Sequence, residues 1–146
     1  LLLATAIVHG AGIFTVLFAY ERQVELELAH ARRHPILAFS LLIAVLIVTH
    51  LVEILLWALL FTSIDAIATL SEAFYFAATT YTTLGYQDVR FPVEYRILPA
   101  MLALAGVFMI GWTTGVLFAV TNGLLQSMIR TRRSRRRHHR LLGEQR

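Results

Sequence analysis

Three ionisable side chains fall inside apolar stretches of the sequence: His9, His50 and Glu53. A charge in hydrocarbon is costly, so such residues pair with one another or mark a path for protons or ions. The three could form a proton site, a metal site, or a hydrogen-bonded contact that ties two apolar helices together. We favour the hydrogen-bonded contact and keep the other two uses open.

A second group that could do chemistry is the hydroxyl-rich segment TTYTTLGYQD at residues 79–88. It follows an apolar and aromatic stretch for which Ser71 is the predicted N-cap and Glu72 suits the first turn. The predicted helix has about ten residues, too few to cross about 30 Å of hydrocarbon. Irregular backbone at membrane depth is tolerated only where it is buried in protein or lines a water-filled path. The segment therefore predicts a re-entrant loop beside a pore.

The composition predicts an all-α membrane protein. Of the 146 residues, 58% are hydrophobic and only 15% are charged, which is low for a soluble domain. Three apolar stretches reach the roughly 20 residues that a spanning helix needs: 1–20, about 36–61 and about 97–125. The chain has no cysteine, which excludes disulfides, thiolate metal sites and thiol nucleophiles.

The basic residues predict the topology. Arg22, Arg32 and Arg33 lie between the first two apolar stretches, and seven arginines and two histidines lie in residues 130–140. The positive-inside rule places both groups in the cytoplasm. The N-terminus and residues 62–96 are then outside.

This topology brings His9 and Glu53 to similar depths, with His50 one helical turn further in. We therefore expect His9 and Glu53 to touch. Trp112 and Thr113, in the third apolar stretch, are expected to offer Glu53 further partners.

Residues 79–88 resemble the potassium channel signature, Thr-Val-Gly-Tyr-Gly-Asp. Tyr75 and Phe76 precede the segment as aromatic residues do in that family, and Gly106 and Gly111 lie where the family's inner helix bends. The resemblance covers about residues 36–125, and it leaves the first apolar stretch as an additional helix. It implies a homotetramer, because one chain supplies one filter segment. It also implies K⁺ as the permeant ion, with no bound cofactor.

In this family, rings of backbone carbonyls replace the hydration shell of the ion. By resemblance, K⁺ binds at the carbonyls of four filter residues and at the Thr83 hydroxyl. These four residues are Thr83, Leu84, Gly85 and Tyr86, and Gln87 completes the predicted ion-binding filter.

Gln87 departs from the family pattern, which has a second glycine there. The family glycine has a positive φ, which costs another residue about 1–2 kcal/mol. The filter could keep its shape with Gln87 strained, or its outer end could open and discriminate poorly between K⁺ and Na⁺. Gln87 could also simply reach solvent at the mouth of the pore.

Other residues are implied as supports. Thr79 occupies the position of a glutamate that, in some relatives, shares a proton with the aspartate matching Asp88. Tyr75 is therefore the predicted partner of Asp88, with plain helix packing as the alternative for its side chain. The predicted cavity and gate follow one stripe of the third helix, for which helix packing is the alternative: Gly106, Val107, Ile110, Gly111, Thr114, Phe118 and Asn122.

The predicted organisation has four parts. They are an additional helix at 1–20, a cytoplasmic loop at 21–35, a pore domain at 36–127 and a basic cytoplasmic tail at 128–146. Within the pore domain the pore helix is expected at 71–82, the filter at 83–87 and the inner helix at 97–127.

The predicted function is that of a passive cation channel of the bacterial inner membrane that favours potassium. The arginines between Arg130 and Arg140 are expected to bind anionic lipid rather than nucleic acid. An enzyme is not expected, because no nucleophile–base arrangement lies outside the apolar stretches. A different class remains as an alternative, a metal- or haem-binding redox protein that uses His9, His50 and either His30 or His34.

Overall fold

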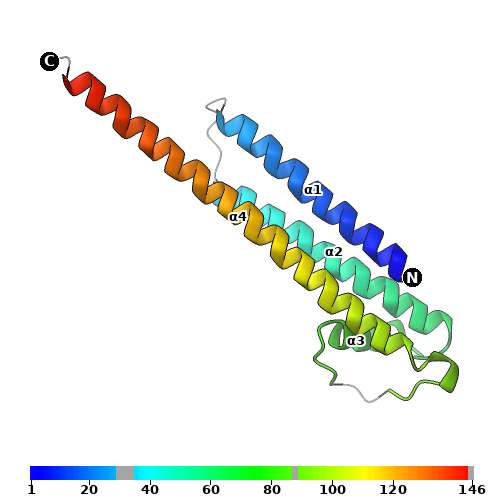
Figure 1. Ribbon diagram of the computed structural model, residues 1–146. Helices are drawn as coiled ribbons and strands as arrows, with labels where there is room; N and C mark the ends of the chain where they lie inside the picture. Colours follow the sequence, from blue (N-terminus) through cyan, green and yellow to red (C-terminus); the bar gives the residue numbers. More distant parts are fainter. Residues whose placement is uncertain (29–34, 87–88, 145–146) are drawn as a thin grey trace. The chain divides into compact units, whose positions relative to one another are not determined.

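The computed structural model describes residues 1–28, 35–86 and 89–144. The described residues form four α-helices and one short 3₁₀ helix, without a strand (Figure 1): α1 (Leu2–Leu28), α2 (Pro35–Ser63), α3 (Leu70–Tyr81), η1 (Val93–Tyr95) and α4 (Leu98–Glu144).

The predicted all-α membrane architecture is confirmed. Within the described residues, three segments are long and apolar enough to cross a membrane: Leu2–Arg22, Phe39–Ser63 and Val93–Gln126. The contacts divide the chain into two units, residues 1–113 and 114–146, and the second consists of the remainder of α4 and the chain end.

Two helices run further than the sequence predicts. Helix α1 continues to Leu28, through much of the loop predicted at 21–35, and α4 continues to Glu144 rather than ending near 127. The extension of α1 is rich in Glu and Leu and that of α4 is rich in Arg, and all three residue types are strong helix formers. The helix ends were predicted where the sequence changes from apolar to polar, and this change alone does not end a helix.

Helix α3 begins one residue earlier than predicted, and Ser71 is not its cap. Thr69 has extended backbone (φ −122°, ψ 146°), and its hydroxyl accepts a hydrogen bond from the Glu72 backbone N–H at 3.3 Å. Thr69 and Glu72 have the spacing of a capping box, and this spacing identifies Thr69 rather than Ser71 as the N-cap.

Helices α1 and α2 pack side by side and run in opposite directions (Figure 1). They approach each other closely at Gly12, where an added Cβ would lie 2.3 Å from the Thr49 Oγ1 atom. Ile13 and Val16 on α1 are buried nearby in the chain, as are Leu42 and Leu46 on α2. The missing side chain of Gly12 thus allows the two backbones to approach.

An aromatic cluster joins α2 to α3 and to the chain after α3. The ring centroids of Phe61, Phe76 and Phe91 are 5.2 to 5.4 Å apart, and Trp57 lies 6.0 Å from Phe61. All four side chains are buried. Because Phe91 follows the glycine-containing segment and Phe76 precedes it, the cluster holds both of its ends.

The first part of α4 crosses the end of α3. Leu102, Ala105 and Met109 are buried on one side of α4. Between them, a Cβ added to Gly106 would lie 1.9 Å from the Tyr81 carbonyl oxygen. This position therefore accepts no side chain without a shift of the backbone.

Candidate functional site

The segment after α3 turns back on the end of the helix. The Thr83 N–H donates to the Thr80 carbonyl at 3.0 Å, and the Leu84 and Gly85 N–H groups both donate to the Thr79 carbonyl, at 2.8 and 3.0 Å. The peptide bonds are trans, so each carbonyl points opposite to the N–H of its own peptide plane. The Thr83 and Leu84 carbonyls therefore point away from the end of α3.

Two residues of this segment have left-handed backbone, Thr83 at φ 62° and Gly85 at φ 66°. Such a conformation costs a threonine about 1–2 kcal/mol and is maintained only when the surroundings impose it. The strain predicted at Gln87 cannot be compared with it, because Gln87 and Asp88 lie outside the described residues. The strain found at Thr83 is a feature that the sequence did not predict.

The predicted supports of the segment have different positions. Thr79 is buried, and its carbonyl anchors the Leu84 and Gly85 N–H groups, while its hydroxyl donates to the Phe76 carbonyl at 3.0 Å. The Tyr75 side chain is 49% exposed in the subunit. Its predicted contact with Asp88 involves a residue that the structure does not describe.

The segment itself is open on the surface of the subunit. Residues 82–86 are all exposed, with Leu84 at 54% and Tyr86 at 73%. A single subunit thus leaves the carbonyls of Thr83 and Leu84 uncovered.

The three ionisable residues predicted to cluster are brought together. The His9 Nδ1 atom lies 2.8 Å from the Glu53 Oε1 atom, so the predicted contact is confirmed. His50 Nδ1 is 3.7 Å from the other carboxylate oxygen. His9 and Glu53 have no exposed surface in the subunit.

Two further side chains complete the cluster. The Tyr81 hydroxyl donates to Glu53 Oε2 and lies 2.8 Å from His50 Nδ1. The Thr113 hydroxyl lies 3.0 Å from His50 Nε2 and 3.3 Å from His9 Nε2. The hydrogen bonds close a circle, which we call the five-residue ring: Glu53, His9, Thr113, His50 and Tyr81.

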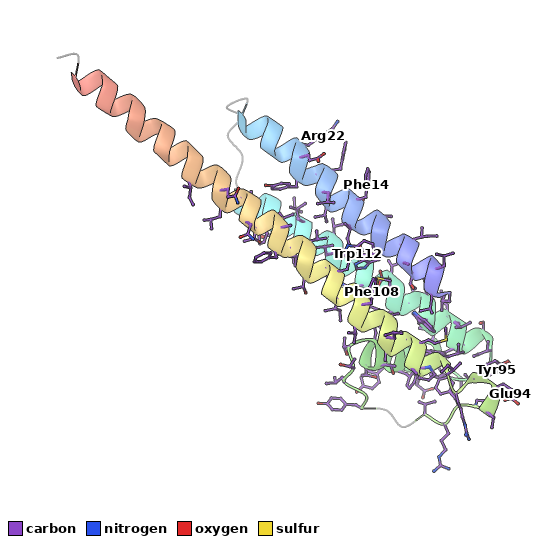
Figure 2. The ribbon with its side chains drawn as sticks, viewed as in Figure 1. Phe14, Arg22, Glu94, Tyr95, Phe108 and Trp112 are labelled. Carbon is purple, nitrogen blue, oxygen red and sulfur yellow. The ribbon has the colours of Figure 1, made fainter. Side chains whose placement is uncertain are left out.

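The ring differs from the prediction in two respects. Thr113 joins the two histidines to each other and not to Glu53, and the Trp112 ring lies against His9 with centroids 5.4 Å apart. Figure 2 shows Trp112 on α4 one turn from Phe108. Tyr81 was not predicted, because a tyrosine in an aromatic-rich helix gives no sequence signal for where its hydroxyl points.

Three of these residues have side chains that can ligate a metal ion. One ligand atom each from His9, His50 and Glu53 lie within 4.8 Å of one another. His30 and His34, invoked for a haem or a redox metal, lie outside the described residues.

The stripe predicted to line a cavity is divided. Gly106 is buried against Tyr81, which gives it a packing role that its prediction as a cavity residue did not include. Val107 and Ile110 are exposed, and a shallow apolar groove is lined by Val107, Phe108, Gly111 and Trp112. In the second unit Thr114 and Phe118 are exposed and Asn122 is half-buried.

The comparison with known families agrees with this architecture. Residues 39–122, more than half of the 146-residue chain, match a family described as ion channel. The match begins in α2, includes α3 and the segment after it, and ends in α4. A search of curated proteins and a search of solved structures give no match. The chain is a multi-pass membrane protein that belongs to the ion channel family.

Proposed function

We propose that the protein conducts potassium passively through a pore formed by residues 83–87 of several identical chains. The main support is the orientation of the Thr83 and Leu84 carbonyls, which point away from α3 on the open surface of the subunit. Such oxygens can replace the water that K⁺ loses on entering a filter. The C-terminal end of α3 adds partial negative charge, which favours a cation.

A homotetramer is part of this proposal. One chain provides one carbonyl row, and a filter needs rings of them. The apolar side chains that α4 exposes near the groove, including Leu104, Val107 and Phe108, supply a surface for neighbouring copies. In this arrangement α4 is innermost and α1 is outermost, against lipid.

The proposal extends to location and orientation. The N-terminus is outside and the arginines between Arg130 and Arg140 are in the cytoplasm of a bacterial cell, where they bind anionic lipid of the inner membrane. Conduction follows the ion gradient and involves no catalysis.

The decisive experiment is ion flux in liposomes that contain the purified protein. A potassium gradient should drive flux, and no flux under any cation gradient would contradict the proposal.

The alternative, a poorly selective cation channel, depends on Gln87 and is tested by the reversal potential in mixed K⁺ and Na⁺ solutions. We expect Gln87→Gly to raise the preference for K⁺, because glycine relieves the φ restriction. Equal and high selectivity in both proteins would remove the poorly selective alternative.

A further inference from the structure

We propose that the five-residue ring is a binding site for one exchangeable proton. The ring joins α1, α2, α3 and α4. The inference goes beyond conduction and does not depend on it. It rests on the number of hydrogens that the ring needs, the number that its residues supply, and the charge that results.

The ring has five links. They are Glu53–His9, His9–Thr113, Thr113–His50, His50–Tyr81 and Tyr81–Glu53, and each joins two N or O atoms within 3.3 Å. Each ring atom on Glu53 and on the histidines serves one link, and the two hydroxyl oxygens serve two links each. A complete circle therefore needs one hydrogen for every link.

The residues in their ordinary ionisation states supply one hydrogen too few. Tyr81 and Thr113 supply one hydroxyl hydrogen each, a neutral His9 and a neutral His50 supply one N–H each, and an ionised Glu53 supplies none. Two lone pairs must then face each other in one link. One additional proton fills that link, whether His9, His50 or Glu53 carries it, and a second would force two hydrogens into the same link.

The charge count gives the same answer. Without the additional proton the ring carries the charge of Glu53, and with it the ring is neutral. His9 and Glu53 are fully buried, Tyr81 is 1% exposed and Thr113 is 8% exposed. An uncompensated charge at such a place is costly, so the neutral ring with every link filled is favoured.

The surroundings fit a proton better than a metal ion. Every side-chain nitrogen and oxygen of the ring already has a hydrogen-bond partner, so a metal would have to break links to gain ligands. The titratable groups that face Glu53 in the described residues are His9 from α1, His50 from α2 and Tyr81 from α3, and α4 presents Thr113, which does not titrate. The His50 side chain is 19% exposed, which gives a proton a way in.

Raising the pH should remove this proton and open one link. The comparison is therefore made between about pH 6 and about pH 9, on the two sides of neutrality. The stability that the complete ring contributes is then present at the lower pH and lost as the pH rises.

The substitution Glu53→Gln separates this inference from a purely structural role. An amide in place of the carboxylate supplies the missing hydrogen itself, so the ring closes with both histidines neutral. The thermal midpoint of the parent protein in detergent should fall by roughly 5 °C between about pH 6 and pH 9. That of Glu53→Gln should not share this fall. The matched control is Glu72→Gln, the same chemical change at an exposed position, which should behave as the parent does.

The three proteins share every other residue, so the difference between variants is the measurement. A parent whose midpoint does not fall, or a Glu53→Gln variant that falls as steeply as the parent, would overturn the proposal. So would a rise of the parent's midpoint on adding Zn²⁺ that Glu53→Gln does not show, since the site would then bind metal. If Glu53→Gln does not fold, ¹⁵N spectra of the ring nitrogens and the carboxyl infrared band of the parent count the protons directly. The loss of one proton is expected, and any other number contradicts the site.

Discussion

Tyr81 connects the five-residue ring to the packing of the helices. Its hydroxyl donates to Glu53, while its carbonyl lies where Gly106 leaves room. The next residue, Thr82, caps α3, and the strained Thr83 follows at once. The position of one phenol ring therefore fixes where the carbonyl-bearing segment begins.

Removing the Tyr81 hydroxyl should destabilise the protein more than the small size of the group suggests. Tyr81→Phe leaves a carboxylate oxygen of Glu53 and a nitrogen of His50 without their partner. We expect the free energy of unfolding to fall by about 1–3 kcal/mol. Unfolding in mixed micelles with increasing sodium dodecyl sulfate measures it. The control is Tyr95→Phe, where the side chain is exposed, and equal losses in the two variants would contradict the role of the ring.

The residues of the ring show how far sequence reasoning reaches. The contact of His9 with Glu53 could be predicted from the sequence. An ionisable residue is easily recognised in an apolar stretch, and its position along the stretch gives its depth in the membrane. Tyr81 and the actual partners of Thr113 could not be predicted, because they depend on the rotation of α3 and α4 about their axes. The hydropathy of a sequence gives the depth of a residue in the membrane but not the rotation of its helix. The same limit explains why Gly106 was predicted on an open face and lies against Tyr81.

At the scale of helices, two glycines decide how closely neighbours pack. Gly12 admits Thr49 of α2, and Gly106 admits the end of α3. The helices themselves could be predicted from length and hydropathy, and their existence is confirmed. Their ends could not, because the polar segments after the first and third apolar stretches are also good helix formers.

The contact of α1 with α2 can be tested with two glycines on one helix. A Cβ at Gly12 would lie 2.3 Å from Thr49 Oγ1, whereas a Cβ at Gly10 would meet nothing within 4 Å. Gly12→Ala should lower the free energy of unfolding by about 1–3 kcal/mol through overpacking. Gly10→Ala should leave it unchanged or raise it by up to about 1 kcal/mol, since alanine favours a helix. Sodium dodecyl sulfate titration of both proteins checks this, and similar effects would mean that α1 does not pack on α2 at Gly12.

The crossing of α4 over α3 can adjust less to an added side chain than the contact of α1 with α2. A Cβ at Gly106 would lie 1.9 Å from a backbone oxygen, which cannot rotate away as a side chain does. We expect Gly106→Ala to lower the free energy of unfolding by about 1–3 kcal/mol or more. The matched variant on α4 is Gly111→Ala, where nothing lies within 4 Å in the subunit. If Gly106→Ala is as stable as Gly111→Ala, then α4 does not approach Tyr81 as closely as described.

For the whole molecule, the exposed surfaces of the chain are compatible with the proposed assembly of several copies. The carbonyl-bearing segment is exposed, and α4 exposes large apolar side chains beside it, as α1 does along its own length. Lipid can cover the apolar side chains of α1. Lipid offers no water or positive charge to the carbonyls of Thr83 and Leu84, and in the proposed assembly an ion and neighbouring copies would cover them.

Assembly can be tested in a chain that has no cysteine of its own. In a fourfold channel with α4 innermost, Phe118→Cys places one thiol on each copy near the axis, and oxidation should give linked pairs of chains. Phe14→Cys, on α1, is equally exposed in the subunit but faces lipid in such an assembly, and it should give none. Native mass spectrometry in mild detergent should find four copies of the parent. Linked pairs from Phe14→Cys alone would place α1 and not α4 at the centre, and a stable monomer or dimer would contradict the tetramer, because fewer than four segments cannot surround a dehydrated ion.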